Sequence, residues 1–164
     1  MTKDEFILNV RKTQEALRRF LVALCCGNTM AADDIAQDTY IKAWLSIESF
    51  RGNSEFAFWV RKIAYNTFIS YKRSHDAETL RLDDSLQTPV DEHNEADKAY
   101  RYEDLYAALD SLSDKERSAV VLFYLEDYSI KDISDILHLT GHAVKQLLYR
   151  GRKHLKVVIT TEQI

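Results

Sequence analysis

Residues 141 to 156 combine the side-chain types that proteins use to bind double-stranded DNA. Lysine and arginine neutralise phosphates, while lysine and glutamine can also hydrogen-bond to base edges in the major groove. No acidic residue occurs between Ile136 and Thr161, so the segment carries only positive charge. An ordinary helix with a basic solvent face is the alternative. The outward side of the expected helix holds His142, Lys145, Gln146, Tyr149, Lys153 and Lys156, with Arg150 and Arg152 at its flanks.

Residues 56 to 73 present a second pattern, in which cationic and aromatic side chains share one side of an expected helix. Cations that track phosphates beside aromatics that stack on unpaired bases are typical of single-strand binding. A solvated face, or a contact with a partner helix, is the alternative. At about 100° per residue, the core stripe is Phe56, Trp59, Val60, Ile63, Ala64, Thr67, Phe68 and Tyr71. The opposite side holds Phe58, Arg61, Lys62, Tyr65, Ile69, Lys72 and Arg73.

Helices must position both patterns, and the end of the chain predicts a helix-turn-helix. A short helix starts at Ser129 and ends at Leu137, and a break over 138–140 precedes a last helix that reaches about Val158. In this motif the recognition helix places its N-terminal residues in the major groove and its later basic residues near the backbone. The two apolar faces are Ile130, Ile133, Ile136 and Leu137, then Val144, Leu147, Leu148, Gly151 and Leu155.

The rest of the chain also predicts helices, and the expected fold class is all-α. Ser113 and Glu116 form a capping-box pattern, in which two side chains satisfy exposed amides at a helix start. A helix over 100–112 is expected to be amphipathic through Tyr102, Leu105, Tyr106 and Leu109. Apolar residues at helical spacing place further helices over 3–25, 31–47, 55–73 and 113–125.

Charge is distributed unevenly along the chain. Residues 1–75 carry a net charge of +3, residues 76–127 a net of −10 and residues 128–164 a net of +3. Residues 76–95 hold seven acids, one arginine and the only proline, which is the composition of a linker. We therefore predict two small helical domains, 1–75 and 96–164, joined by a flexible acidic linker. Basic ends fit a protein that grips DNA, although charges that merely solvate helix faces would look the same.

Several protein classes are disfavoured by what the sequence lacks. No apolar run approaches the roughly 20 residues of a membrane span, and the N-terminus lacks the apolar stretch of a signal peptide. Cys25 and Cys26 follow one another in an apolar helical run, and we expect reduced core thiols in a cytoplasmic protein. We find no phosphate loop, nucleophile–base arrangement or metal-ligand spacing, so we expect no enzyme, catalytic residue, cofactor or metal.

Three stretches resemble, in order, the segments of a known family. Asp33 to Trp44 (DDIAQDTYIKAW) resembles the sigma-factor segment that docks on RNA polymerase. Phe50 to Arg73 (FRGNSEFAFWVRKIAYNTFISYKR) resembles the segment that melts and reads the −10 promoter element. Leu109 to Leu155 resembles the domain that reads the −35 element. The sequence is therefore similar to sigma factors of the sigma-70 family, and its length points to the extracytoplasmic-function (ECF) type.

The resemblance implies a sigma factor that binds core RNA polymerase and promoter DNA, with an anti-sigma factor, membrane-associated in some systems, as a further partner. The residues that match the polymerase-binding motif are Asp33, Asp34, Gln37, Asp38, Lys42 and Trp44. Those assigned to −10 DNA are Asn53, Phe58, Arg61, Lys62, Tyr65, Asn66 and Arg73. Those assigned to −35 DNA are Thr140, His142, Lys145, Gln146, Tyr149, Arg150, Arg152 and Lys153.

The sequence departs from the family pattern at a few positions of the helix-turn-helix. His138 stands where the family has a turn glycine, and histidine tolerates a left-handed turn better than a branched residue does. Ser134 replaces a small apolar residue, and Ala143 and Leu147 stand where threonine and a basic residue are frequent. The departures at 143 and 147 bear on individual DNA contacts at these two positions and leave the expected docking mode unchanged. A helix-turn-helix regulator with an unrelated N-terminal module is the alternative function.

Overall fold

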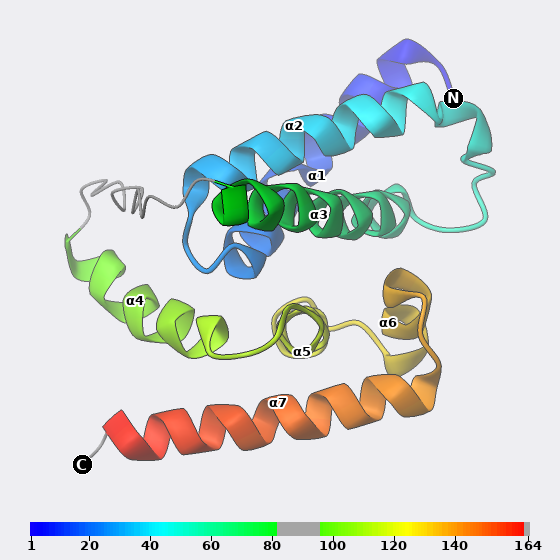
Figure 1. Ribbon diagram of the computed structural model, residues 1–164. Helices are drawn as coiled ribbons and strands as arrows, with labels where there is room; N and C mark the ends of the chain where they lie inside the picture. Colours follow the sequence, from blue (N-terminus) through cyan, green and yellow to red (C-terminus); the bar gives the residue numbers. More distant parts are fainter. Residues whose placement is uncertain (82–95, 163–164) are drawn as a thin grey trace. The chain divides into compact units, whose positions relative to one another are not determined.

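The computed structural model describes residues 1–81 and 96–162, and every regular element within these ranges is a helix (Figure 1). The predicted all-α class is confirmed. The chain divides into two compact units, the first made of Met1–Leu21 with Met30–Glu92 and the second of Val22–Thr29 with His93–Ile164. The predicted linker lies outside the described residues from residue 82 to residue 95. The domain boundaries 1–75, 76–95 and 96–164 stay a prediction.

The first unit is built on most of α1 (Lys3–Leu24) and α2 (Thr29–Leu45) and on α3 (Phe56–Arg81), with a short 3-10 helix, η1 (Ile47–Ser49), after α2. The end of α1, residues 22–24, belongs to the second unit. The helices pack because each turns apolar side chains inward. Polar contacts also join them, since the Thr13 and Tyr40 hydroxyls lie 3.0 Å apart. The largest fully buried side chains of this unit are Leu17, Phe20, Leu21, Ile35, Val60 and Phe68.

Five aromatic rings join the start of α1, the end of α2 and the start of α3. Neighbouring ring centroids lie 5.0 to 6.0 Å apart in tilted or edge-on arrangements, which stabilise a fold by about 0.5–1.5 kcal/mol per pair beyond burial. Because the cluster holds both ends of the loop over 51–55, it positions that loop at the start of α3. The rings belong to Phe6, Trp44, Phe50, Phe56 and Trp59.

The second unit holds α4 (Ala96–Asp110), α5 (Asp114–Val120), the π-helix η2 (Val121–Leu125), α6 (Ile130–Leu137) and α7 (Gly141–Glu162). α5 and α7 approach closely at Gly151, where a Cβ would lie only 2.7 Å from Cγ2 of Val120. The largest fully buried side chains of these helices are Leu109, Val121, Leu122, Ile133 and Ile136.

Hydroxyl side chains cap the helix starts of the second unit, as the sequence predicts for two of them. Ser113 Oγ accepts from the Glu116 amide at 3.2 Å, and Ser129 Oγ accepts from the Asp132 amide at 3.1 Å. The second half of the predicted capping box, in which the Glu116 side chain bonds back to the start of its own helix, is wrong, however. The Glu116 carboxylate is instead 2.8 Å from Nδ1 of His154 on α7, so it joins two helices rather than closing its own.

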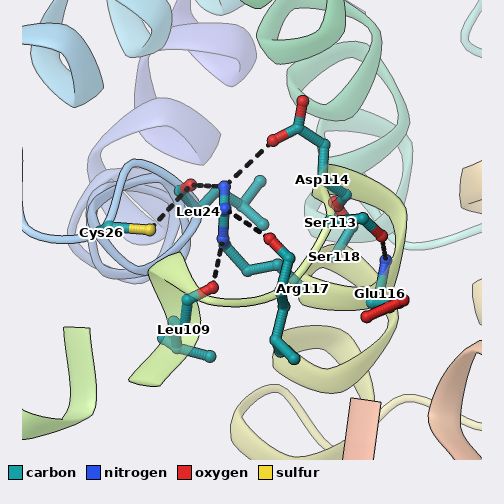
Figure 2. Close-up of polar contacts among 9 residues, drawn as sticks. Leu24, Cys26, Leu109, Ser113, Asp114, Glu116, Arg117 and Ser118 are labelled. Atoms are coloured by element: carbon teal, nitrogen blue, oxygen red, sulfur yellow. Dashed lines mark hydrogen bonds and ion pairs between the residues drawn. The ribbon is translucent and has the colours of Figure 1, made fainter. Parts of the chain in front are cut away.

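Arg117 forms the polar centre of the second unit and is 5% exposed. Its guanidinium donates to the carbonyl oxygens of Leu109 at 2.9 Å and Leu24 at 3.1 Å (Figure 2). It also donates to the carbonyl oxygen of Leu112 at 3.0 Å and to the Asp114 carboxylate at 3.2 Å. Carbonyl groups at helix ends lack partners within their own helix, and this one side chain bonds to carbonyls at the ends of α1 and α4 and in the turn before α5.

The structure corrects several sequence-based expectations. α3 continues to Arg81, so the expected loss of helix from residue 76 is wrong over 76–81. Cys25 and Cys26 are half-buried, so their predicted place in the core is wrong. None of the helices in residues 1–81 and 96–162 combines the length and apolar character that crossing a membrane requires.

Candidate nucleic-acid and polymerase interfaces

α7 carries seven of the eight residues that the sequence assigns to −35 DNA, the eighth, Thr140, directly precedes the helix, and all eight are exposed. Two contacts order the exposed face of α7. Gln146 Nε2 lies 3.2 Å from His142 Nε2, and Lys153 Nζ lies 5.4 Å from the Tyr149 ring centroid. Thr140 caps the helix, since its hydroxyl accepts from the Ala143 amide at 3.1 Å. The start of α7 therefore presents polar side chains on a helix whose N-terminus is capped.

The turn between α6 and α7 has the geometry that a helix-turn-helix needs. His138 adopts a left-handed conformation with φ of 56°, which confirms the expectation for this departure from glycine. The Leu139 amide then donates to the Ser134 carbonyl at 3.0 Å, closing the end of α6. Ile133, Ile136 and Val144 are buried between the two helices and their neighbours. The recognition face is thus set by a packed turn.

Arg152 lies at the edge of this face, and its guanidinium contacts a neighbouring surface of the second unit. Its Nη1 donates to the Tyr124 hydroxyl of η2 at 3.0 Å. Both residues line an open groove of about 460 Å³ between α4, η2 and α7. The rim is basic, and the floor is apolar. The lining residues are Leu105, Leu109, Val120, Tyr124, Leu125, Arg152, Leu155 and Lys156.

Sequence reasoning missed this groove. Its amphipathic pattern placed Tyr102 and Leu105 on a buried face, but they are 50% and 37% exposed, so that expectation is wrong. Tyr124 and Leu125, in the π-helical turn, are 48% and 52% exposed. An excess of large apolar residues over what a short helix can bury was the available signal, because exposed apolar patches mark interaction sites.

α3 shows a different picture from the one its charge pattern predicts. Arg61 and Tyr65 are only 3% and 5% exposed, so their predicted place on the outward face is wrong. The Arg61 guanidinium lies 5.3 Å from the Phe20 ring centroid of α1. Arginine can stack on an aromatic face while it is buried. A basic residue at an outward helical position therefore need not face solvent.

Burial of this region also affects Tyr40 on α2. Burial raises the pKa of the Tyr40 phenol above its ordinary value, while the hydrogen bond with Thr13 and the positive charge of Arg61 act in the opposite direction. The phenol thus stays protonated at neutral pH. The group made of Phe20, Tyr40 and Arg61 belongs to the interior of the first unit.

The remaining residues assigned to −10 DNA are accessible. Asn53, Asn66 and Arg73 are exposed, and Phe58 and Lys62 are half-buried. Lys62 Nζ lies 4.8 Å from the Phe58 ring centroid, so a cation and an aromatic ring, the two side-chain types that single-strand binding combines, are neighbours. Together, these residues and the 51–55 loop form the accessible basic face of α3.

The α2 residues assigned to polymerase binding are all exposed: Asp33, Asp34, Gln37, Asp38, Lys42 and Trp44. Some have neighbours within the unit. Arg18 Nε donates to Asp33 at 2.8 Å, and Lys42 Nζ donates to Thr67 at 3.4 Å. Large apolar side chains that the sequence reading did not single out lie exposed on the same helix, namely Met30, Ile41 and Leu45. α2 thus mixes acidic and apolar groups, as protein-binding surfaces do.

A helix-turn-helix with a basic recognition face, together with a helical unit that exposes an acidic and apolar helix, defines a DNA-binding transcription factor with a protein partner. Residues 10–78 match the family model described as sigma-70 region 2, and residues 102–155 match the one described as sigma-70 region 4. This chain belongs to the ECF RNA polymerase sigma factors of the sigma-70 family.

Similar proteins agree with this membership. The chain is 30% identical over 144 residues to the ECF sigma factor SigM of Bacillus subtilis, covering 85% of this chain and 86% of that protein. It is 32% identical over 142 residues to SigW of Bacillus subtilis, covering 79% and 76%. The sigma factor RpoE of Bartonella quintana, solved in complex with the anti-sigma factor NepR, has a TM-score of 0.78 at 25% identity, covering 95% and 97%.

Membership gives the general function. The protein is a sigma factor that binds core RNA polymerase and directs promoter-specific transcription initiation. A helix-turn-helix regulator that does not act with polymerase is not favoured. Sigma factors as a family are regulatory proteins and not enzymes.

Proposed function

We propose that the exposed face of α7 reads the −35 promoter element. The observation that carries this proposal is the exposure of all eight predicted residues on α7 and at its N-cap, within a helix-turn-helix. His142, Lys145, Gln146 and Tyr149 lie closest to the bases, because the start of a recognition helix reaches deepest into the groove. Arg150 and Lys153 contact phosphates, and Arg152 does so only when it leaves Tyr124.

The accessible basic face of α3 contacts the −10 element. Lys62, Asn66 and Arg73 supply cationic and amide groups, Phe58 supplies a ring for stacking, and Asn53 lies in the loop that the aromatic cluster positions. Arg61 and Tyr65 support this face from the interior and do not themselves touch DNA. Stacking and phosphate contact together suit a melted strand.

Two surfaces take protein partners. The exposed α2 face, with Asp34, Asp38 and Trp44, docks on core RNA polymerase. An anti-sigma factor, a partner named for the Bartonella quintana relative, binds the second unit at the groove of α4, η2 and α7. The apolar floor with Arg152 and Lys156 at its rim favours an amphipathic helix that carries acidic residues. We place these events in the cytoplasm.

Charge reversal on α2 tests the polymerase surface. The double variant Asp34→Lys with Asp38→Lys is expected to lose core-polymerase binding in a pull-down while its circular dichroism stays that of the parent, because both side chains are exposed. The matched control is Asp110→Lys with Asp135→Lys, which changes the net charge equally at exposed positions of the second unit. Unchanged binding by the first variant would refute the assignment.

A further inference from the structure

Two side chains of the α7 face touch each other. Gln146 Nε2 lies 3.2 Å from Nε2 of His142, one turn earlier on the helix. Both side chains are exposed, and residues four apart lie on the same side of a helix. Their contact therefore fixes the orientation of the Gln146 carboxamide before DNA arrives.

The atoms in contact define the chemistry of the pair. A carboxamide nitrogen only donates hydrogen bonds, so the contact is a hydrogen bond in the tautomer of His142 that carries its proton on Nδ1 and leaves Nε2 as the acceptor. One amide hydrogen of Gln146 is then committed to His142. The other amide hydrogen and the Oε1 acceptor remain available to a base. This donor and acceptor pair matches adenine, which offers N7 as acceptor and the N6 amine as donor.

We propose that His142 is a positioning residue, which holds the Gln146 carboxamide in the orientation that selects adenine over guanine within the −35 element. The proposal rests on the proposed −35 function of α7. Guanine presents two acceptors, N7 and O6, to the major groove. A carboxamide that is free to turn can offer its NH₂ group to guanine, whereas one held by His142 places Oε1 against O6, where two acceptors repel.

The test uses three single substitutions and one double. His142→Phe keeps a planar ring and removes the acceptor, His142→Gln keeps an acceptor of similar reach, and Gln146→Ala removes the reading group. Each variant, and His142→Phe with Gln146→Ala, is assayed with core polymerase on a promoter library randomised at the −35 element. The adenine-to-guanine ratio is read at every position.

The proposal predicts that His142→Phe lowers the adenine preference at least about fivefold, at the same position that Gln146→Ala affects. His142→Gln retains the preference, and the double variant equals Gln146→Ala at that position, since coupled residues are not additive. Changes at two different positions that add in the double variant would overturn it, because His142 would then read its own base. A wild-type profile for His142→Phe would also overturn it.

The tautomer provides a second readout that does not depend on transcription. Nitrogen-15 chemical shifts of His142 in the free protein are expected to show a proton on Nδ1 and none on Nε2, and the distinction should weaken in Gln146→Ala. A proton on Nε2 would reverse the donor and acceptor roles and overturn the adenine assignment. If the wild-type protein selects no −35 sequence with core polymerase while the tautomer is as expected, the failure lies with the proposed function.

Discussion

α3 and α7 both carry basic side chains suited to nucleic acid, but the two helices sit differently in their units. In α7 and at its N-cap all eight assigned residues are exposed. In α3 the adjacent residues Arg61 and Lys62 separate, with Arg61 buried against Phe20 and Lys62 half-buried beside Phe58. α3 thus buries one of its cationic side chains, Arg61, in the packing of its unit, whereas the cationic side chains assigned to DNA on α7 are all exposed.

The difference follows from what surrounds each helix. Arg61 has neighbours on both other helices of its unit, Phe20 on α1 and Tyr40 on α2. In the second unit the buried arginine is Arg117, which lies on α5 and not on α7, and its guanidinium donates to three carbonyl oxygens. The comparison teaches that charge on a helical wheel indicates a DNA face only when the helix is packed on one side.

The largest expected effect is the loss of stability on removing a buried arginine side chain. Arg117→Ala is expected to lower the free energy of unfolding by about 3 kcal/mol, because three carbonyl oxygens each lose a hydrogen bond from a buried guanidinium. Arg61→Ala is expected to cost about 1–2 kcal/mol through lost packing on Phe20. Urea unfolding followed by far-ultraviolet circular dichroism measures both changes.

Arg150, which is exposed, and Lys62, which is half-buried, supply the controls for that measurement. Arg150→Ala on α7 and Lys62→Ala on α3 are expected to change stability by less than about 0.5 kcal/mol. If Arg61→Ala proves as harmless as Lys62→Ala, Arg61 faces solvent and the contrast between the two helices collapses.

A smaller effect concerns phosphate contact by α7. Lys153→Ala is expected to weaken binding of the reconstituted holoenzyme to all promoters alike, and to reduce the salt dependence by about one unit of slope. Lys115→Ala, at an exposed lysine of α5, serves as the control and should leave the slope unchanged. Fluorescence anisotropy over a range of salt concentrations gives the slopes. Equal slopes for Lys153→Ala and the parent would remove Lys153 from the backbone contacts.

Much of the architecture could be predicted because it depends on local signals. Helical periodicity predicted where the helices lie, and Ser113 and Ser129 indicated the starts of two of them. The break after Leu137 predicted the helix-turn-helix. These features arise from a few neighbouring residues, so one sequence contains enough information. The left-handed conformation of His138 followed in the same way from its place in the turn.

The misses depend on tertiary contacts that periodicity does not report. Arg61 reads as outward until Phe20 of another helix covers it. The sequence predicts Glu116 as half of a capping box, but its carboxylate instead contacts His154, which lies 38 residues later in the chain. The groove beside Tyr124 depends on how α4, η2 and α7 assemble. Burial of a charged group is decided by its partners, which lie far away in sequence.

Transcription by core polymerase from a promoter library randomised separately at the −10 and −35 elements tests the two DNA faces most directly. Lys145→Ala on α7 is expected to change the −35 preference by about 1–3 kcal/mol at one position and leave the −10 preference intact. Asn66→Ala on α3 is expected to do the reverse. A Lys145→Ala variant that keeps the wild-type −35 profile, or that alters the −10 profile instead, would contradict the assignment of α7 to the −35 element.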